Sequence, residues 1–377
     1  MATAQKRIET ESFFLTSSIA GDVWHEKTNP EAFEWWYFDA VSEDGRDAVV
    51  IIFLDNFIFS PRYNRTSQKR TGLFQKVKNR FSRKSADSVQ NLFPAIAFTY
   101  YRDGKPKYRA INEFPPAEFS AGVEAPSCRI GDNFFRVESA PYGSGYVLSI
   151  NAKLRKNRNL EAHFEWLSVE SDFLPEKPVN LENAHVWNLV VSRADVTGRI
   201  TVSEDAGKTL DTVHFRGTGY HDHNIDNRWL PEIVSDWQWG RAHFSDATAV
   251  FYRYRENGEA YSTTKLLTIK DGNFLVRDAA IEEQNFARDK FGIKYPKLLR
   301  FISEDNTQLE VRQKKIIDSS FFYLRFFSEM TLTQPDGATR ETTGITEYFA
   351  PKVLKYRWLD WLTNMRIGRK GKGAFLP

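Results

Sequence analysis

The amino-acid sequence predicts a mainly β protein, an antiparallel sandwich or barrel with few short helices. Turn pairs that tolerate a positive φ angle recur along the chain and are typical of links between twisted antiparallel strands. They are Asp44-Gly45, Asp103-Gly104, Asn257-Gly258, Asp271-Gly272 and Asp336-Gly337. Aromatic residues make up 15% of the chain, and their side chains favour strands and bury large areas. Long helical patterns are scarce.

Between these turns, apolar and polar residues alternate with the period of a strand. The alternate positions of segment 146–155 form one apolar face: Tyr146, Leu148, Ile150, Ala152 and Leu154. Segments 308–312 and 328–333 repeat this pattern. Pro175 and Pro178 interrupt it, and a fresh series of strands begins at Ile200. We therefore expect two β-domains, residues 1–195 and 196–377.

Composition excludes several classes of protein. The formal net charge is +3, so no global nucleic-acid signal appears. Cys128 is the single cysteine, which rules out an intrachain disulfide and favours a reducing compartment. The N-terminal residues lack the apolar core of a signal peptide. The longest apolar run, 48–54, is far shorter than the roughly 20 residues that span a bilayer. We expect a cytoplasmic protein.

Two basic segments stand out from this balanced charge. Segment 60–84 contains nine cations and no acid. Four of its apolar residues share one helical face: Leu73, Phe74, Val77 and Phe81. Segment 352–372 combines cations with Leu354, Trp358, Trp361 and Leu362. Each segment is interpretable as a solvated loop or tail. Alternatively, both make peripheral contact with the inner, anionic face of a membrane.

Reactive side chains concentrate in Gly217–Asn224 and in Trp237–Arg241. On a strand, His221 and His223 share one face, and Asp222 faces the other way. The glycines and Asn224 favour an irregular backbone, which leaves the direction of Asp222 open. The histidines could form a metal site with His185 or His243. We favour a metal-free polar network that orients one acid.

Further aromatic clusters accompany this string. Glu34 lies among the rings of Phe33–Ala40, where desolvation would raise its pKa, although pairing with an arginine is an equal alternative. Trp237, Trp239 and Arg241 share a strand face. The tryptophans form either a core ladder or a wall that stabilises a cation. His185 and Trp187 repeat the pairing of histidine with an aromatic ring.

These motifs together resemble the carotenoid 1,2-hydratase family, also called hydroxyneurosporene synthases, whose relatives include AttH-like proteins and lipocalin-like Diels–Alderases. The resemblance rests on Glu34–Tyr37, His185 with Trp187, Gly219–Asn224 and Trp237–Arg241. It implies two consecutive lipocalin-like domains and cofactor-free chemistry on polyenes or isoprenoids. In such hydratases a carboxylic acid protonates a terminal trisubstituted alkene, and water captures the tertiary cation.

The chain departs from this family pattern at two positions. His223 matches the family histidine, but the tryptophan expected soon after it is replaced by Ile225. The strand expected to supply a tyrosine and the catalytic aspartate contains Tyr252-Arg253-Tyr254, without an acid. Asp222, Glu34 or Asp226 would then donate the proton. The absence of the family's aspartate also favours cyclisation, in which an internal alkene of the substrate captures the cation in place of water.

We therefore predict a cofactor-independent, metal-free enzyme that protonates an alkene of a lipophilic isoprenoid, a hydratase-like lyase or a terpene cyclase or isomerase. The predicted catalytic residues are Asp222, His223, His221 and Glu34. The predicted substrate-binding residues are Trp35, Trp36, Tyr37, His185, Trp187, Asn188, Tyr220, Asn224, Trp237, Trp239, Arg241, Tyr252 and Tyr254. The alternatives are a pericyclase, with Asn188, Asn224 or Tyr220 polarising a carbonyl, and a non-catalytic carrier of a lipophilic ligand.

Overall fold

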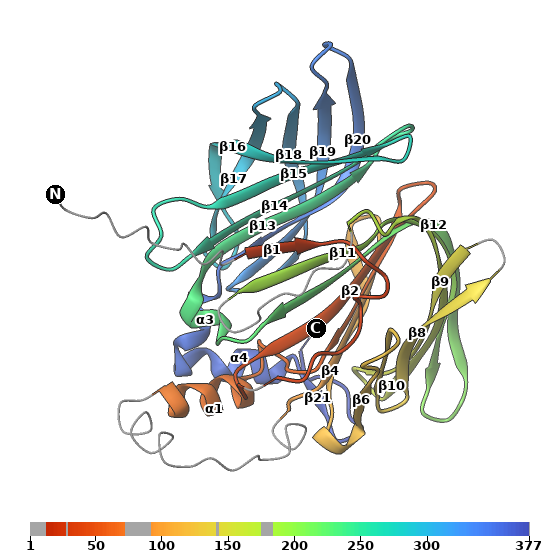
Figure 1. Ribbon diagram of the computed structural model, residues 1–377. Helices are drawn as coiled ribbons and strands as arrows, with labels where there is room; N and C mark the ends of the chain where they lie inside the picture. Colours follow the sequence, from red (N-terminus) through yellow and green to blue (C-terminus); the bar gives the residue numbers. More distant parts are fainter. Residues whose placement is uncertain (1–12, 28, 72–91, 141–142, 175–183, 377) are drawn as a thin grey trace.

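The first part of the chain folds into a large curled sheet (Figure 1). The computed structural model describes residues 13–27, 29–71, 92–140, 143–174 and 184–376. Within these residues the strands of the sheet follow the order β21-β5-β4-β3-β2-β12-β11-β10-β9-β8-β7-β6, and β1 pairs with β11. The strands are β1 (Phe13–Thr16), β2 (Phe33–Ser42), β3 (Asp47–Leu54), β4 (Ala95–Arg102), β5 (Lys105–Glu113), β6 (Phe119–Ala121), β7 (Ser127–Ile130), β8 (Asn133–Ala140), β9 (Gly143–Leu154), β10 (Arg158–Ser171), β11 (His185–Glu204), β12 (Thr209–Asp226) and β21 (Gly368–Arg369).

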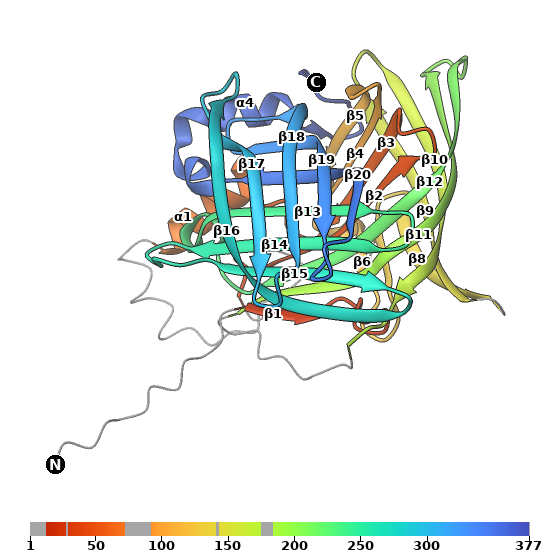
Figure 2. The same cartoon turned by 90° about the horizontal axis from the view of Figure 1, so that it is seen from above.

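A closed antiparallel barrel follows, seen from above in Figure 2. Its strands are β13 (Val234–His243), β14 (Thr248–Glu256), β15 (Thr263–Lys270), β16 (Asn273–Arg288), β17 (Lys294–Ser303), β18 (Gln308–Ser319), β19 (Tyr323–Thr333) and β20 (Thr339–Phe349). All five turn pairs named above connect neighbouring strands, and the glycine of each has a positive φ, from 66° to 92°. The mainly β fold is therefore confirmed.

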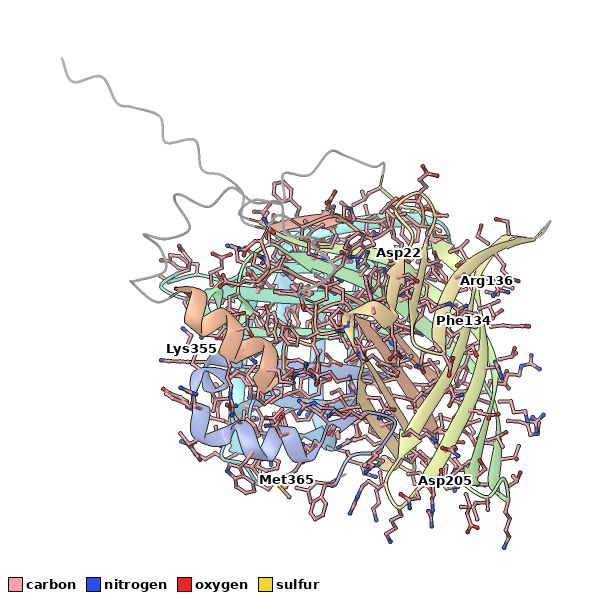
Figure 3. The ribbon with its side chains drawn as sticks, turned by 90° about the horizontal axis from the view of Figure 1, so that it is seen from below. Asp22, Phe134, Arg136, Asp205, Lys355 and Met365 are labelled. Atoms are coloured by element: carbon pink, nitrogen blue, oxygen red, sulfur yellow. The ribbon has the colours of Figure 1, made fainter. Side chains whose placement is uncertain are left out.

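The short helices gather on one side of the molecule, where α1, α3 and α4 lie together (Figure 1). Their bounds are α1 (Pro61–Thr71), η2 (Pro116–Glu118), α3 (Leu230–Ile233), η3 (Pro351–Lys355), η4 (Arg357–Leu359) and α4 (Asp360–Met365). Helix α1 contacts η3 and α4 (Figure 3). The predicted apolar helical face of segment 60–84 lies outside the described residues. None of the described helices is long and apolar enough to cross a bilayer.

Strand alternation divides the apolar side chains between separate cores. One core fills the inside of the curled sheet and includes Trp36, Phe38 and Trp166. Another lies between the outer face of the sheet and the barrel, and includes Trp187 and Trp237. A third fills the barrel interior. The alternation predicted for segment 146–155 is confirmed, because its apolar face is buried throughout.

The transition from sheet to barrel lies between β12 and β13. The sheet continues through β11 and β12 to Asp226, and the barrel begins at Val234. The predicted boundary at residues 195/196 falls inside β11, in the middle of its antiparallel pairing with β12. The "fresh series" that begins at Ile200 is the last five residues of that long strand, followed by β12. The division of the chain into two domains stays a prediction.

Candidate active site

The conspicuous string of reactive residues lies on one regular strand, β12, and alternation sends its members to opposite faces of the sheet. Asp222 and Tyr220 point to the core shared with the barrel, whereas His221 and His223 point into the curled sheet. Neighbouring β2 pairs with this strand residue by residue, from Gly217↔Ser42 to Asp226↔Phe33. The string keeps a continuous register with β2, which fixes the direction of each side chain. The irregularity lies in its pairing with β11, where the register shifts twice opposite Gly219–His223.

Asp222 is buried, with an exposed fraction of 4%. Three neutral donors approach its carboxyl group. Oδ2 accepts hydrogen bonds from Tyr220 Oη at 2.8 Å and Trp187 Nε1 at 3.1 Å, and Oδ1 accepts one from Asn224 Nδ2 at 2.9 Å. Tyr220 in turn accepts a hydrogen bond from Trp239 Nε1 at 3.2 Å. The acid is thus positioned by side chains of its own face, and the prediction that His221 or His223 orients it is wrong.

Burial raises the pKa of Asp222 to about 7, against the lowering effect of the hydrogen bonds from Tyr220 and Trp187. The negative charges of Glu347 and Asp39 also raise this pKa. No arginine, lysine or histidine among the described residues forms an ion pair with the group. A carboxyl group with these surroundings holds its proton near neutral pH, as a general acid must.

Asp222 lines a small cavity of about 30 Å³ between the sheet and the barrel. The cavity walls are Trp35, Tyr37, Asp222, Asn224, Trp237, Trp239, Tyr252 and Glu347. A larger cavity of about 170 Å³ shares Trp35, Tyr37, Trp237 and Glu347 with it. Most of its other walls are apolar, from β3, the loop after β3, β4 and β19. The two cavities adjoin at these four shared residues, and Asp222 lines the smaller one; the pair of adjoining cavities is called the path below.

Aromatic rings surround this path. The rings of Trp35 and Trp237 lie 5.7 Å apart, and Tyr37 meets Trp239 edge-on at 5.3 Å. Tyr252 stacks on Trp187 at 4.6 Å, and its hydroxyl lies 2.8 Å from Nε2 of His185. The tryptophan faces can stabilise a positive charge on a ligand, each by roughly 0.5–2 kcal/mol.

His221 and His223 belong to a buried ionic cluster inside the curled sheet. His221 Nε2 lies 2.9 Å from Oδ2 of Asp22, and His223 Nδ1 lies 3.1 Å from Oδ1 of the same residue. His223 Nε2 lies 2.7 Å from Glu34, and its ring stacks on Trp36. These carboxylates raise the pKa of His223 to about 9, although burial opposes the charge. Both histidines therefore lie on the face of β12 opposite the cavity.

Glu34 is also part of this cluster, where it is paired with cations. Lys27 Nζ lies 2.6 Å from Glu34, and His25 Nδ1 lies 2.9 Å from it. Burial alone would raise the pKa of Glu34, but Lys27 and His223 hold it well below its usual range. The raised pKa considered for this residue is therefore wrong. The alternative interpretation is confirmed in part: Glu34 is a paired carboxylate, but its partner is Lys27 rather than an arginine.

The three-histidine metal site considered for His221 and His223 is not assembled. The other two histidines are elsewhere. His185 Nε2 lies close to the Tyr252 hydroxyl, and His243 Nε2 lies 2.8 Å from the Ser192 carbonyl oxygen. Donor atoms of His25, Glu34 and His223 do lie within 4.8 Å of one another. The Lys27 ammonium group, however, already supplies a cation beside Glu34.

Several other predicted residues lie away from the cavity. Arg241 joins the barrel to the sheet through an ion pair with Asp39. Asn188 bonds the backbone of Ser18, with its Oδ1 accepting at 3.0 Å and its Nδ2 donating at 2.9 Å.

Tyr254 also lies outside the small cavity, because its ring stacks on His185 and its hydroxyl donates to Glu256 at 3.2 Å. Asp226, the third candidate acid, is bound by Arg228 through both carboxylate oxygens, each at 2.9 Å. It is therefore a paired carboxylate.

Sequence reasoning missed Glu347, which lines both cavities. Glu347 accepts hydrogen bonds from Tyr37 Oη at 3.1 Å and Arg325 Nε at 2.8 Å. It comes from β20, 310 residues after Tyr37. Apart from the Thr-Glu-Tyr context of its strand, no local signal distinguishes this glutamate from the other acids of the barrel.

The fold and the site define a lipocalin-like β protein with a proton-bearing acid at the end of an apolar cavity. The model of the carotenoid hydratase (CrtC) family matches residues 168–375. A protein of Chlorobaculum tepidum named hydroxyneurosporene dehydrogenase is 28% identical over 366 residues, which cover 95% of this chain and 93% of that protein. The chain therefore belongs to the carotenoid hydratase family. It is an enzyme of the hydro-lyase class that acts on a lipophilic substrate.

Solved structures agree with this assignment at the level of the fold. An AttH-like protein of Nitrosomonas europaea superposes with a TM-score of 0.55 at 13% identity, over 88% of this chain and 95% of that one. A crystal structure of CghA with Sch210972 gives a TM-score of 0.52 at 13% identity, over 90% and 97%. The resemblance drawn from the sequence motifs is confirmed.

Proposed function

We propose that this protein hydrates a terminal trisubstituted alkene of a carotenoid-type isoprenoid, with Asp222 as the proton donor and without a cofactor. The observation that carries this proposal is the environment of Asp222. It is a buried carboxyl group without a cationic partner among the described residues, and it faces an aromatic cavity. The other acid of the cavity, Glu347, differs from Asp222 because it forms an ion pair with Arg325.

In the first step, the O–H bond of Asp222 breaks and its proton adds to the less substituted carbon of the alkene. The electron pair of the π bond forms the new C–H bond, which leaves a tertiary cation on the neighbouring carbon. Trp35, Trp237 and Trp239 line the cavity at this point, and their π faces favour that cation. The product of the step is a cation next to a newly formed Asp222 carboxylate.

In the second step, water adds to the cation and returns a proton to Asp222. The small cavity, at about 30 Å³, exceeds the roughly 10–15 Å³ that one water molecule requires. Asn224 Oδ1 is buried there and has no hydrogen-bond partner among the described residues. It can accept a hydrogen bond from the attacking water.

Cyclisation is a second candidate, favoured by the aromatic walls of the path and by the small space for water beside Asp222. If an internal alkene of the substrate lies closer to the cation than water does, it forms a ring instead. The acid and the first step are the same in both reactions.

We also propose that the protein meets its substrate at an anionic membrane surface. Trp358 and Trp361 are exposed by 69% and 57% on the C-terminal helical segment. The C-terminal segment also carries exposed cations, and α1, which contacts η3 and α4, adds two more. They are Arg62, Arg65, Lys352, Arg357, Lys370 and Lys372. Interfacial tryptophans with surrounding lysine and arginine are typical of peripheral membrane binding. Helix α4 carries Trp361 outward and Thr363 toward the larger cavity.

Product analysis tests the proposed reaction. The protein is incubated with the acyclic carotenoid lycopene in detergent, and the products are separated and weighed by mass spectrometry. A gain of one water supports hydration, an isomer of equal mass supports cyclisation, and unchanged lycopene in a tight complex would overturn catalysis in favour of a carrier.

The matched variant is Asp222→Asn, which keeps the shape of the acid and removes its proton. We expect a loss of turnover of at least about 10³-fold, with retained binding of lycopene. Circular dichroism and thermal unfolding check that the variant is folded. Full turnover by folded Asp222→Asn would overturn the role of this residue.

A further inference from the structure

Charge is distributed unevenly over the walls of the two adjoining cavities. Arginines and acids both line the larger cavity. The small cavity is lined by two carboxyl groups, those of Asp222 and Glu347, and no arginine, lysine or histidine of the described chain joins them there. Glu347 lines both cavities, whereas its partner Arg325 lines the larger one alone. This ion pair therefore presents its negative end to the cavity of the acid.

The contacts of Glu347 fix this orientation. Tyr37 Oη, at 3.1 Å, and Arg325 Nε, at 2.8 Å, both donate to Oε1 of Glu347, and Arg325 Nη2 lies 2.7 Å from the same oxygen. A parallel fork would engage both carboxylate oxygens, but here both guanidinium nitrogens meet one of them. Oε2 takes no part in these contacts. The carboxylate is thus held by one oxygen, and the other is left to face a ligand.

Arg325 is itself held by aromatic neighbours. Its Nη1 donates to Tyr101 Oη at 2.9 Å, and its guanidinium group lies over the rings of Tyr37 and Tyr323, 5.7 Å and 5.3 Å from their centroids. The side chains of Arg325 and Glu347 are exposed by 5% and 10%. Little water therefore screens the carboxylate, and its attraction for a nearby cation is stronger than on a surface.

We propose that Glu347 is a catalytic residue, the fixed anion that stabilises the tertiary carbocation formed beside Asp222. This role rests on the proposed function for the proton transfer itself. The small cavity measures about 30 Å³, so the groups on its walls lie close to one another and to an alkene end that reaches it. An anion placed in advance where positive charge develops lowers the barrier without reorganising during the reaction. Arg325 is the positioning residue behind it.

The charge of Glu347 also acts on Asp222, in two stages. Before the transfer it raises the pKa of Asp222 and so keeps the acid protonated. After the transfer, the new negative charge on Asp222 is offset by hydrogen bonds from Tyr220, Trp187 and Asn224. The carbocation is a hydrocarbon group and accepts no such bonds. The π faces of the tryptophan walls and the carboxylate of Glu347 are what compensate it.

Turnover of lycopene gives a first test. Glu347→Gln keeps the shape of the side chain and removes its charge. We expect the maximal rate to fall at least about tenfold with the affinity for lycopene unchanged, because the carbocation exists only during the reaction. A full rate in the folded variant would overturn the proposal. If the wild type does not convert lycopene, the proposed function fails, and the binding experiment below still decides whether Glu347 attracts positive charge at this site.

Binding of a stable cation tests the role of Glu347 without turnover. The probes are N,N-dimethyldodecylamine, whose protonated end resembles the tertiary carbocation in shape and charge, and the neutral alcohol dimethyl dodecyl carbinol. Calorimetry at pH 7.5 gives both dissociation constants for Asp222→Asn, which lacks the charge of the acid, with and without Glu347→Gln. We expect the ratio of the alcohol constant to the amine constant to fall at least about tenfold when Glu347 is replaced. An unchanged ratio would overturn the proposal, whatever the lycopene experiment shows.

Further variants in the Asp222→Asn protein separate charge from structure. Because Glu347→Gln leaves a buried Arg325 unpaired, Glu347→Gln/Arg325→Gln removes both charges and should show the same loss of preference for the amine. Arg325→Gln alone keeps the anion and should keep that preference. Glu341→Gln removes an exposed acid of β20 and is the matched control, with an unchanged ratio. A loss in Arg325→Gln equal to that in Glu347→Gln would indicate a purely structural role and contradict the inference.

Discussion

Asp222 and Glu34 are both fully enclosed carboxyl groups, and their neighbours set opposite protonation states. Around Glu34 the cations of Lys27 and His223 more than offset desolvation, so the pKa is held well below its usual range. Around Asp222 only neutral donors are present, and burial raises the pKa to about 7. The separation of the two pKa values supports the proposed assignment of Asp222 as the proton donor and of Glu34 as a paired anion.

Tyr220→Phe tests this assignment at a single hydrogen bond. The Tyr220 hydroxyl donates to Asp222 at 2.8 Å and thereby lowers its pKa. Its removal should raise the pKa that governs activity by up to about one unit, with the maximal rate reduced by less than about tenfold. The measurement is the pH dependence of turnover in both proteins. A shift to lower pH would contradict the assumed direction of the hydrogen bond.

Asp222→Asn should also change how stability depends on pH. The pKa of Asp222 is raised on folding from about 4 to about 7, so the folded state holds this proton more tightly than the unfolded state. The wild-type protein therefore loses stability as the pH rises through this window, and the loss is complete above pH 7. The asparagine variant lacks this loss. Urea unfolding at pH 5 and pH 8 should show a smaller decline for the variant, and equal declines would contradict the raised pKa.

At this scale the sequence led to Asp222 as the proposed acid, a role that stays a prediction, but it did not predict the surroundings of this residue. Asp222 was the preferred donor because it lies in a dense polar string, and the alternation of a strand turned it away from the histidines. Its hydrogen bonds to Tyr220 and Asn224 join residues two positions apart, which a strand pattern can suggest. By contrast, Glu347 contacts Tyr37, and Arg366 lines the same cavity, although these residues come from distant segments of the chain. A single sequence does not predict such contacts.

Strand β12 is the element that organises the site, because it serves two cores at once. Its barrel-facing side carries the acid, and its opposite side carries His221 and His223 on the carboxylates of Asp22 and Glu34. From the sequence, Gly217 and Gly219 suggest an irregular backbone. A side chain at Gly219 would instead meet Trp166 Nε1 at 2.3 Å, so this glycine provides space for close packing within a regular strand.

His223→Gln tests the structural role of this opposite side. Removing the imidazolium leaves Asp22 and Glu34 with one cation fewer in a buried site, which should cost about 3–5 kcal/mol of unfolding free energy at pH 7. The pKa of His223 is raised to about 9 on folding, so its stabilisation is complete below pH 6.5 and is lost as the pH rises through 9.

Chemical denaturation at pH 6.5 and pH 9.5 measures this difference. The wild type should lose more stability than His223→Gln over that interval. His163→Gln, on the exposed face of β10, is the matched control and should behave as the wild type. A difference between wild type and His223→Gln that stays constant with pH would contradict the charged histidine.

At the scale of the whole molecule, the cavity exists because a sheet packs on the outside of a barrel. Tyr37 from β2 reaches Glu347 in β20, and Asp39 reaches Arg241 in β13. The strand patterns predicted both β regions from periodicity and turn pairs. They could not predict that β11 and β12 complete the first sheet, since a new run of alternating residues looks the same whether it extends one sheet or starts another.

The exposed tryptophans of the C-terminal segment lead to a prediction for the whole surface. The double variant Trp358→Ala/Trp361→Ala should lose at least about tenfold in affinity for vesicles that contain phosphatidylserine, as measured by co-sedimentation. Tyr261→Ala is the control. It removes another exposed aromatic residue, one that belongs to the barrel and is distant in sequence from the C-terminal segment. Equal vesicle binding by the wild type and the double variant would show that this surface does not bind the membrane.

The central claim is that Asp222 delivers its proton to the substrate, and the pH dependence of single-turnover product formation tests it most directly. Because the pKa of this group is raised to about 7, the acid is protonated below that value and active. The account predicts a rate that is level at lower pH and falls tenfold per unit above about pH 7. A rate that stays level from pH 5.5 to pH 9 would contradict it.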